Sequence, residues 1–133
     1  MDNKYKLYQN TEELLSAVNT LDLPKLRTLV DDDFGIVDVD PEGKAVIIND
    51  MKEWEAYMEN NMIAMQSLDA KLSFEISEYN ERVANELAMV VVKFQQQVHL
   101  PESPKSVYDC IATIVWKQSP DGWKEARWHC SRI

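Results

Sequence analysis

The sequence predicts an α+β fold in which helices of the N-terminal half pack on an antiparallel sheet of the C-terminal half. Two observations carry this prediction. Apolar residues recur every three or four positions in three segments of the first half, which is the period of an amphipathic helix. From Ala70 onward they alternate with polar residues, which is the period of a strand with one buried face. Helices followed by a run of strands are typical of the α+β class.

The first two helices are predicted from their caps and apolar stripes. Asn10 precedes Glu13 by three residues, a capping-box pattern that satisfies free backbone amides. Asp22 opens a shorter helix, and Pro24 is tolerated in its first turn because the N–H groups there have no helical partner. The two stripes consist of Leu14, Leu15, Val18 and Leu21, and of Leu23, Leu26, Leu29 and Val30.

A short hairpin and a third helix follow. The run of three aspartates at 31–33 is interpreted as a solvated junction that ends the second helix, before a strand over 34–39. The Asp-Pro-Glu-Gly turn at 40–43 places Pro and Gly where their dihedral preferences fit, and it leads into a strand over 44–48. A second capping box begins at Asp50, and the stripe of this third helix consists of Trp54, Tyr57, Met58, Met62 and Met65.

The second half is predicted to contain four strands. The first begins near Ala70, and the others cover 87–98, 107–118 and 123–131. The Ser-Pro-Asp-Gly sequence at 119–122 joins the last two strands as a hairpin.

Alternation also divides residues between the two faces of this sheet. With a three-residue turn at 120–122, Ile114 pairs with Trp128 and Ala112 pairs with Cys130 on the apolar face. The helices must cover that face, because their own stripes would otherwise stay exposed to water. The opposite face of the last strand then carries Glu125, Arg127, His129 and Ser131.

A curved sheet closed by helices leaves a cone-shaped space, which is the predicted ligand pocket. Core packing is the competing interpretation for the aromatic residues at its walls. The predicted pocket residues are Trp54, Tyr57, Phe74, Phe94, Ala112, Ile114, Trp116, Trp128 and Cys130.

The outer face of the sheet is predicted to be an interface. It mixes apolar and polar residues, namely Val107, Ile111, Thr113, Val115, Lys93, Gln96 and Arg127. Such a face is too apolar to lie wholly in water and less apolar than a core, which suits a homodimer in which two sheets pack together.

Length and charge limit the class of protein. The 133 residues fit one compact domain over 1–133. Fourteen Lys and Arg against 23 Asp and Glu give a formal net charge of −9, which disfavours nucleic acid or an anionic membrane as a partner. No apolar run approaches the roughly 18 residues that span a bilayer, and the polar start does not resemble a signal peptide. We therefore expect a cytoplasmic protein.

Motifs for cofactor or metal chemistry are not found. Cys110 and Cys130 match no metal-ligand spacing, and a disulfide between them is the minority interpretation for a cytosolic chain. His99 and His129 are interpreted as surface groups. The three isolated glycines form no phosphate loop, and no nucleophile motif is present. No cofactor and no metal is predicted.

Several segments resemble the nuclear transport factor 2-like superfamily. They are Asp22-Leu23 before a short helix, Asp32-Asp33 before a strand, Asp38 with Asp40-Pro41, and the closing stretches 113–116, 121–124 and 128–131. The ending is most similar to SnoaL-like domains and to the association domain of calcium/calmodulin-dependent protein kinase. The resemblance implies a cone-shaped, cystatin-like fold and dimerisation through the sheet. It leaves function open, because this superfamily carries isomerases, dehydratases, cyclases, transport factors and oligomerisation modules.

Ketosteroid isomerase provides a test of the chemistry that the resemblance implies. Its Asp base matches Asp38, but its Tyr donor falls on Leu14 and its buried Asp donor on Ala112 or Ile114. None of these can donate a hydrogen bond. One missing donor costs about 10²–10³ in rate, so this isomerase activity is not expected.

The kinase association domain provides a second test, because its pocket arginines suit acidic ligands. Their positions fall on Ile114 and Cys130 and near Lys93, which alternation places on the outer face. An apolar pocket is therefore expected, with Asp38 as the catalytic candidate among the acidic residues. The sequence predicts a protein that binds, and in one interpretation transforms, a small apolar molecule. The alternatives are a non-catalytic association module and, more remotely, a transport factor.

Overall fold

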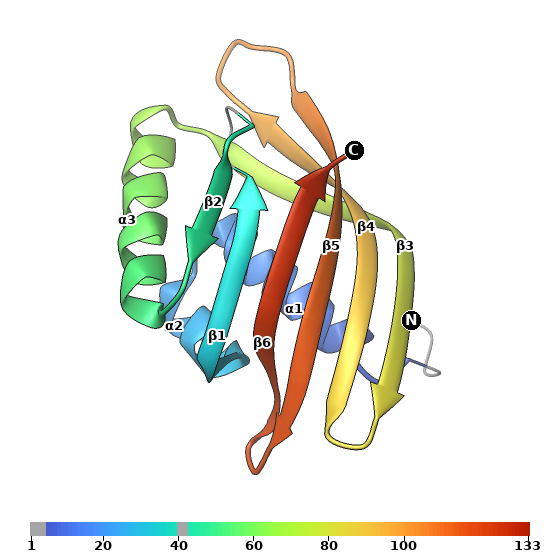
Figure 1. The fold of residues 1–133 in the computed structure, drawn as a ribbon. Coiled ribbons are helices and arrows are strands. Elements are labelled where there is room, and N and C mark those ends of the chain that lie inside the picture. The colour runs from blue at the N-terminus through green and yellow to red at the C-terminus, as the bar shows by residue number, and fades with distance from the viewer. Residues whose placement is uncertain (1–4, 40–42) are drawn as a thin grey trace.

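The computed structural model describes residues 5–39 and 43–133, and within them it forms three helices and one six-stranded sheet (Figure 1). The strand order is β2-β1-β6-β5-β4-β3. Neighbouring strands are antiparallel except β1 and β6, which run parallel. The predicted α+β class is therefore confirmed, and the all-antiparallel sheet is corrected at one pair. The elements are α1 (Tyr8–Thr20), α2 (Leu23–Leu29), β1 (Val30–Val39), β2 (Ala45–Ile48), α3 (Met51–Ser67), β3 (Lys71–Ala84), β4 (Leu87–His99), β5 (Ser106–Ser119) and β6 (Gly122–Arg132).

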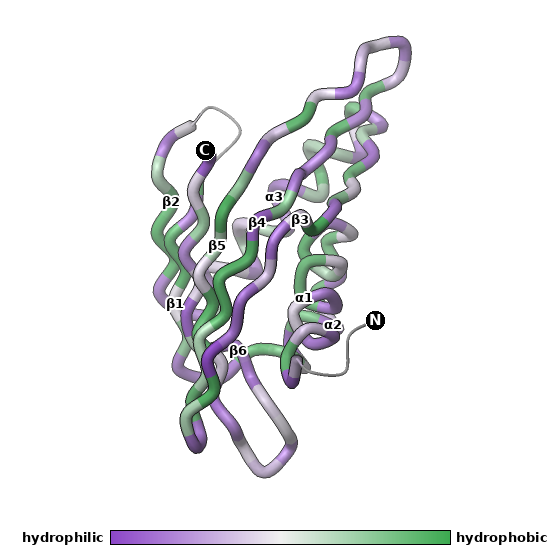
Figure 2. Tube along the Cα trace, turned by 90° about the vertical axis from the view of Figure 1, so that its right-hand side faces the viewer, coloured by the Kyte–Doolittle hydropathy of each residue, from purple (hydrophilic) through white to green (hydrophobic). Residues whose placement is uncertain are grey.

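The helices cover one face of a curved sheet, and the other face is open (Figure 2). Burial alternates along β4, where Val90, Val92 and Phe94 point towards the helices. The helices contribute their own buried stripes to the same core, including Leu14, Leu15, Leu26, Trp54 and Met58. This layered arrangement satisfies the need to bury both sets of apolar side chains.

Two of the three predicted helix starts are confirmed by hydrogen bonds. The Asp22 carboxylate accepts from the Lys25 amide at 3.2 Å. The Asp50 carboxylate accepts from the Glu53 amide at 2.8 Å, and the Glu53 carboxylate accepts from the Asn49 amide at 2.9 Å. These are local caps, so the sequence pattern predicts them.

The predicted start of α1 at Asn10 is wrong. The helix begins at Tyr8, and the preceding Leu7 caps it without a side-chain hydrogen bond. Instead, the carboxylate of Glu81 on β3 accepts from the amides of Lys6 at 2.7 Å and Leu7 at 3.0 Å. A residue more than seventy positions away therefore holds the two residues that precede the helix, which no local pattern indicates.

The hairpin between β5 and β6 contains a bulge, which regular strand alternation does not predict. Ser119 pairs with Gly122, so the turn has two residues and not three. Trp116 pairs with Glu125, whereas Val115 pairs with Arg127, which leaves Ala126 as an extra residue. The extra residue restores the register, and the predicted pairs Ile114–Trp128 and Ala112–Cys130 are confirmed.

Strand β1 is also irregular, at the level of this bulge. It begins at Val30 and includes the aspartates 31–33, which corrects their assignment to a junction. Its register against β6 shifts between Val30 and Gly35. The predicted turn residues 40–42 lie outside the described residues.

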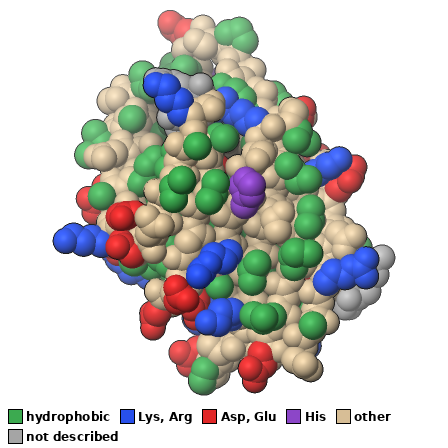
Figure 3. Space-filling model, in the orientation of Figure 1, with side chains coloured by type: hydrophobic (Ala, Val, Ile, Leu, Met, Phe, Trp, Pro, Cys, Tyr) green, Lys and Arg blue, Asp and Glu red, His purple; other side chains and the backbone are tan. Residues whose placement is uncertain are grey.

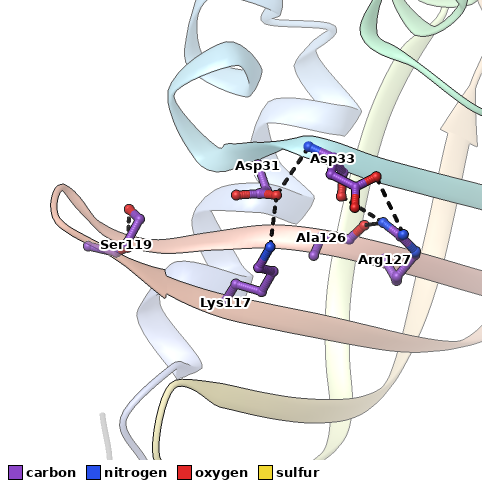
Figure 4. Close-up of polar contacts among 7 residues, drawn as sticks. Asp31, Asp33, Lys117, Ser119, Ala126 and Arg127 are labelled. Carbon is purple, nitrogen blue, oxygen red and sulfur yellow. Dashed lines mark hydrogen bonds and ion pairs between the residues drawn. The ribbon is translucent and has the colours of Figure 1, made fainter.

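Polar contacts join the two irregular segments (Figure 4). Arg127 Nη1 donates to the carbonyl oxygens of Asp33 and Ala126, both at 2.7 Å. Lys117 Nζ lies 3.4 Å from the Asp31 carboxylate. The aspartates therefore help to hold β1 against the bulge. Within the described residues, no helix is long and apolar enough to cross a membrane.

Candidate functional site

A cavity of about 220 Å³ lies between the helices and the inner face of the sheet. Side chains from α1, α3 and all six strands line it. Most of the lining is apolar, with Leu15, Ile36, Met58 and Phe94 among the apolar walls. A concave and mainly apolar space with a few polar groups is the usual form of a small-molecule site.

The residues predicted to form the pocket fall into two groups. Five of them line the cavity, namely Trp54, Tyr57, Phe94, Trp128 and Cys130. The other four do not. Ala112, Ile114 and Trp116 are wholly buried in the core, and Phe74 is partly buried against it. Strand alternation predicts that all four of these side chains point to the inner face. It does not predict which inner-facing side chains pack in the core and which border the cavity.

Asp38 lies in the cavity wall and is held in place by two hydrogen bonds. Its Oδ1 accepts from the Val39 amide at 2.7 Å, and its Oδ2 accepts from Trp128 Nε1 at 3.1 Å. Burial raises the pKa of Asp38, although these hydrogen bonds oppose the effect. The carboxyl is therefore an oriented group of the cavity wall.

Glu125 is a second carboxyl of the cavity, although strand alternation predicts it on the outer face. The bulge turns both Glu125 and Ala126 inward, and Glu125 is only 1% exposed. Burial and the charge of Asp38 raise the pKa of Glu125 to about 8. Its Oε1 has no hydrogen-bond partner among the described residues.

A signal for this inward turn exists in the sequence. Two-residue turns are the commonest hairpin connections. With such a turn at Pro120-Asp121, strict alternation would put the apolar residues of β5 and β6 on opposite faces. One extra residue in β6 returns the apolar residues of the two strands to the same face. Glu125, the residue before the extra one, then points inward as well.

The two cysteines are free, buried and close to each other in the cavity wall. The Cys110 side chain interacts with that of Cys130, and this hydrogen bond together with burial raises the pKa of the Cys130 thiol. Cys130 is therefore a protonated, uncharged part of the wall at neutral pH.

Further polar groups enter the cavity from α1, β4 and β6. Gln96 Nε2 lies 3.4 Å from Asn19 Oδ1, so Gln96 faces inward and its predicted outer position is wrong. Lys93 lies on the outer face, where it pairs with Glu78 at 3.7 Å. Arg132 is the one cation lining the cavity among the described residues, and its guanidinium lies 4.5 Å from the centre of the Tyr108 ring. The resemblance to the kinase association domain placed its arginine positions at Ile114 and Cys130 and near Lys93, so an arginine in the cavity was not expected.

The described residues contain no group of three or more His, Cys, Asp or Glu side chains that could hold a metal ion. His99 and His129 are exposed, and Nε2 of His129 lies 3.5 Å from the hydroxyl of Ser131. The chemistry available in the cavity is therefore that of two carboxyls, two thiols, amides, phenols and one guanidinium.

Comparison with known proteins places this architecture in a family. A family model described as a SnoaL-like domain matches residues 9–133. A search of curated proteins finds no match.

Solved structures are similar over nearly the whole chain. An NTF2-like protein of unknown function in nutrient uptake from Rhodospirillum rubrum is 26% identical, with a TM-score of 0.70 over 97% of this chain and 99% of that one. The CaMKII hub homology domain of Chlamydomonas reinhardtii is 16% identical, with a TM-score of 0.78 over 99% of each chain. The association domain of C. elegans CaMKII is 16% identical, with a TM-score of 0.73 over 97% and 95%.

Proposed function

Because the chain belongs to the SnoaL-like domain family and has the NTF2-like fold, we propose that it binds a small, mostly apolar molecule in the cavity beneath α1 and α3. The observation that carries the proposal is the cavity itself, which combines aromatic walls with a few oriented polar groups. Its volume of about 220 Å³ lies below the roughly 300–1,000 Å³ of sites for drug-sized ligands. A compact ligand of one or two rings therefore fits it best.

Asp38 is the candidate base if the bound molecule is transformed. Its carboxyl is oriented by Trp128 and lines the cavity, which are the geometric requirements for proton transfer to a bound molecule. The positions at which ketosteroid isomerase carries its donors are Leu14, Ala112 or Ile114, and these are buried core residues. These side chains cannot donate a hydrogen bond to a ligand, so we do not propose ketosteroid isomerase activity.

The open face of the sheet supports a homodimer as part of the same proposal. Val37, Met89 and Val107 are 40%, 46% and 48% exposed on this face. Hydrophobic side chains lie across it between charged ones (Figure 3). Exposed apolar side chains of this kind mark interaction surfaces when they form a patch.

A non-catalytic association module is the second candidate. It is favoured by the structural similarity to CaMKII hub and association domains. In that case the outer face would carry the function, and the cavity would have no ligand.

A thermal-shift panel of compact apolar compounds separates the two candidates. Ligand binding raises the melting temperature only of a protein that has a site. We expect several compounds to stabilise the wild type and to lose this effect in Trp54→Ala, since Trp54 lines the cavity. Ile63→Ala is the matched control, because Ile63 lies on the same helix and is 64% exposed. A panel with no stabilising compound would contradict ligand binding and favour the association module.

A further inference from the structure

We propose that Glu125 is a ligand-binding residue that, as a neutral carboxylic acid, donates a hydrogen bond to a carbonyl oxygen of the molecule in the cavity. This inference rests on the proposed ligand-binding function and adds the chemical class of the ligand. The site would select small apolar ketones or similar carbonyl compounds over hydrocarbons of the same shape.

Within the described residues, Glu125 has an unpartnered polar atom, and it lines the cavity. Three buried side-chain atoms have no hydrogen-bond partner among the described residues, namely Thr11 Oγ1, Trp116 Nε1 and Glu125 Oε1. Of these three residues, only Glu125 lines the cavity. Buried polar groups in folded proteins almost always have a partner. A molecule in the cavity can supply the partner that the protein does not.

The bulge makes this position a built feature of the fold. Arg127 fixes the carbonyl of Ala126, the extra residue, and that of Asp33 on β1. The side chain of Glu125 is thereby held on the inner face, where regular alternation would have excluded it. Bulges often direct a side chain towards a functional site.

Glu125 can donate a hydrogen bond because its carboxyl is protonated. Burial and the nearby Asp38 both disfavour the charged form, so Glu125 holds its proton at neutral pH. A protonated carboxyl has one O–H donor, which an ionised carboxylate lacks. The other titratable or charged side chains that face the cavity are Asp38 of β1, Tyr57 of α3, Tyr108 and Cys110 of β5, and Cys130 and Arg132 of β6. Helix α1 contributes Asn19 as its polar lining residue.

The charge balance selects among ligands. A hydrocarbon leaves the buried Glu125 group unpartnered, which carries a cost. A ligand carboxylate beside Glu125 would meet the negative charge of Asp38, and Arg132, the cation of the lining, lies seven residues further along β6. A neutral carbonyl oxygen accepts the hydrogen bond without burying a new charge.

Indane, 1-indanone and 1-aminoindane test this inference, because they share one carbon skeleton and differ in one polar group. Dissociation constants are measured by titration calorimetry for the wild type, Glu125→Gln and Glu125→Met. We expect the wild type to bind 1-indanone about tenfold more tightly than indane, as one buried hydrogen bond would give. Glu125→Gln should keep this preference through its amide N–H, and Glu125→Met should lose it.

The pH dependence provides a second measurement. The preference of the wild type for 1-indanone should fall as pH rises above about 8, whereas that of Glu125→Gln should stay constant. An unchanged preference in Glu125→Met would overturn the inference. So would tighter binding of 1-aminoindane than of 1-indanone, because that result assigns Glu125 to a cationic ligand. If none of the three compounds binds at millimolar concentration, the proposed ligand binding itself fails, and this inference fails with it.

Discussion

Arg127 joins β6 to β1 through a 2.7 Å hydrogen bond from its Nη1 atom to the carbonyl oxygen of Asp33. The same nitrogen lies 2.7 Å from the carbonyl oxygen of Ala126, the bulged residue, and Nη2 lies 3.6 Å from the Asp33 carboxylate (Figure 4). One guanidinium on the outer face therefore fixes the backbone shape that turns Glu125 towards the cavity.

Replacing Arg127 with Met should loosen the bulge and reduce stability. Two hydrogen bonds to backbone carbonyls are lost, and each contributes about 1 kcal/mol to the free energy of unfolding. The exposed ion pair with Asp33 adds little. Urea unfolding measures the difference. The control is Arg82→Met, which removes an exposed arginine from β3, and equal losses in the two variants would contradict a role of Arg127 at the bulge.

Glu125 should make the protein less stable as pH rises. Its pKa of about 8 in the folded protein lies above its ordinary value of 4.5. The folded state therefore keeps a proton that the unfolded state releases, and the free energy of unfolding falls between about pH 5 and pH 8. Urea unfolding at both pH values should show a larger fall in the wild type than in Glu125→Gln. Parallel pH profiles in the two proteins would contradict the raised pKa.

Asp38→Asn should lower the pKa of Glu125 without returning it to 4.5. The substitution removes the negative charge that contributes to the shift, whereas burial of Glu125, the larger cause, is unchanged. The amide oxygen of Asn can still accept from Trp128, so the wall should keep its shape. The measurement is a carbon-13 NMR titration of the Glu125 carboxyl. An identical titration midpoint in Asp38→Asn and wild type would show that the two carboxyls do not interact.

Met89→Glu should convert the proposed dimer into a monomer. Met89 lies on the open face of β4 and is 46% exposed. A carboxylate at that position would be desolvated against a second sheet, which is costly without a partner. Size-exclusion chromatography with light scattering measures the mass at micromolar concentration. Ile63→Glu on α3 is the control and should remain a dimer; a monomeric wild type would contradict the assembly.

Local features of the fold were predictable from the sequence. The caps at Asp22 and Asp50 are confirmed because a cap depends on residues within one helical turn. The inward positions of Val90, Val92 and Phe94 follow from strand alternation, which is equally local. The start of α1 was not predictable, since Glu81 of β3 holds the residues just before it through the amides of Lys6 and Leu7.

The candidate site was only partly predictable for the same reason. Asp38 came from the resemblance to ketosteroid isomerase, and the walls Trp54 and Trp128 came from helical spacing and alternation; all three line the cavity. Arg132 and Gln96 were not placed there, although Gln96 follows the inward phase of Phe94 by two residues. Both residues lie near the ends of their strands, and whether a side chain there lines the cavity depends on where the neighbouring helices and strands end.

The sequence by itself determined the helices, the strands and the apolar face that the helices cover, because these depend on periodicity and short-range capping. The tertiary structure alone decided that β1 runs parallel to β6 and that Glu125 enters the cavity. Both outcomes come from pairing between distant segments. A two-residue turn and a fixed apolar register can coexist only if one residue bulges, and contacts with β1 hold that bulge at Ala126.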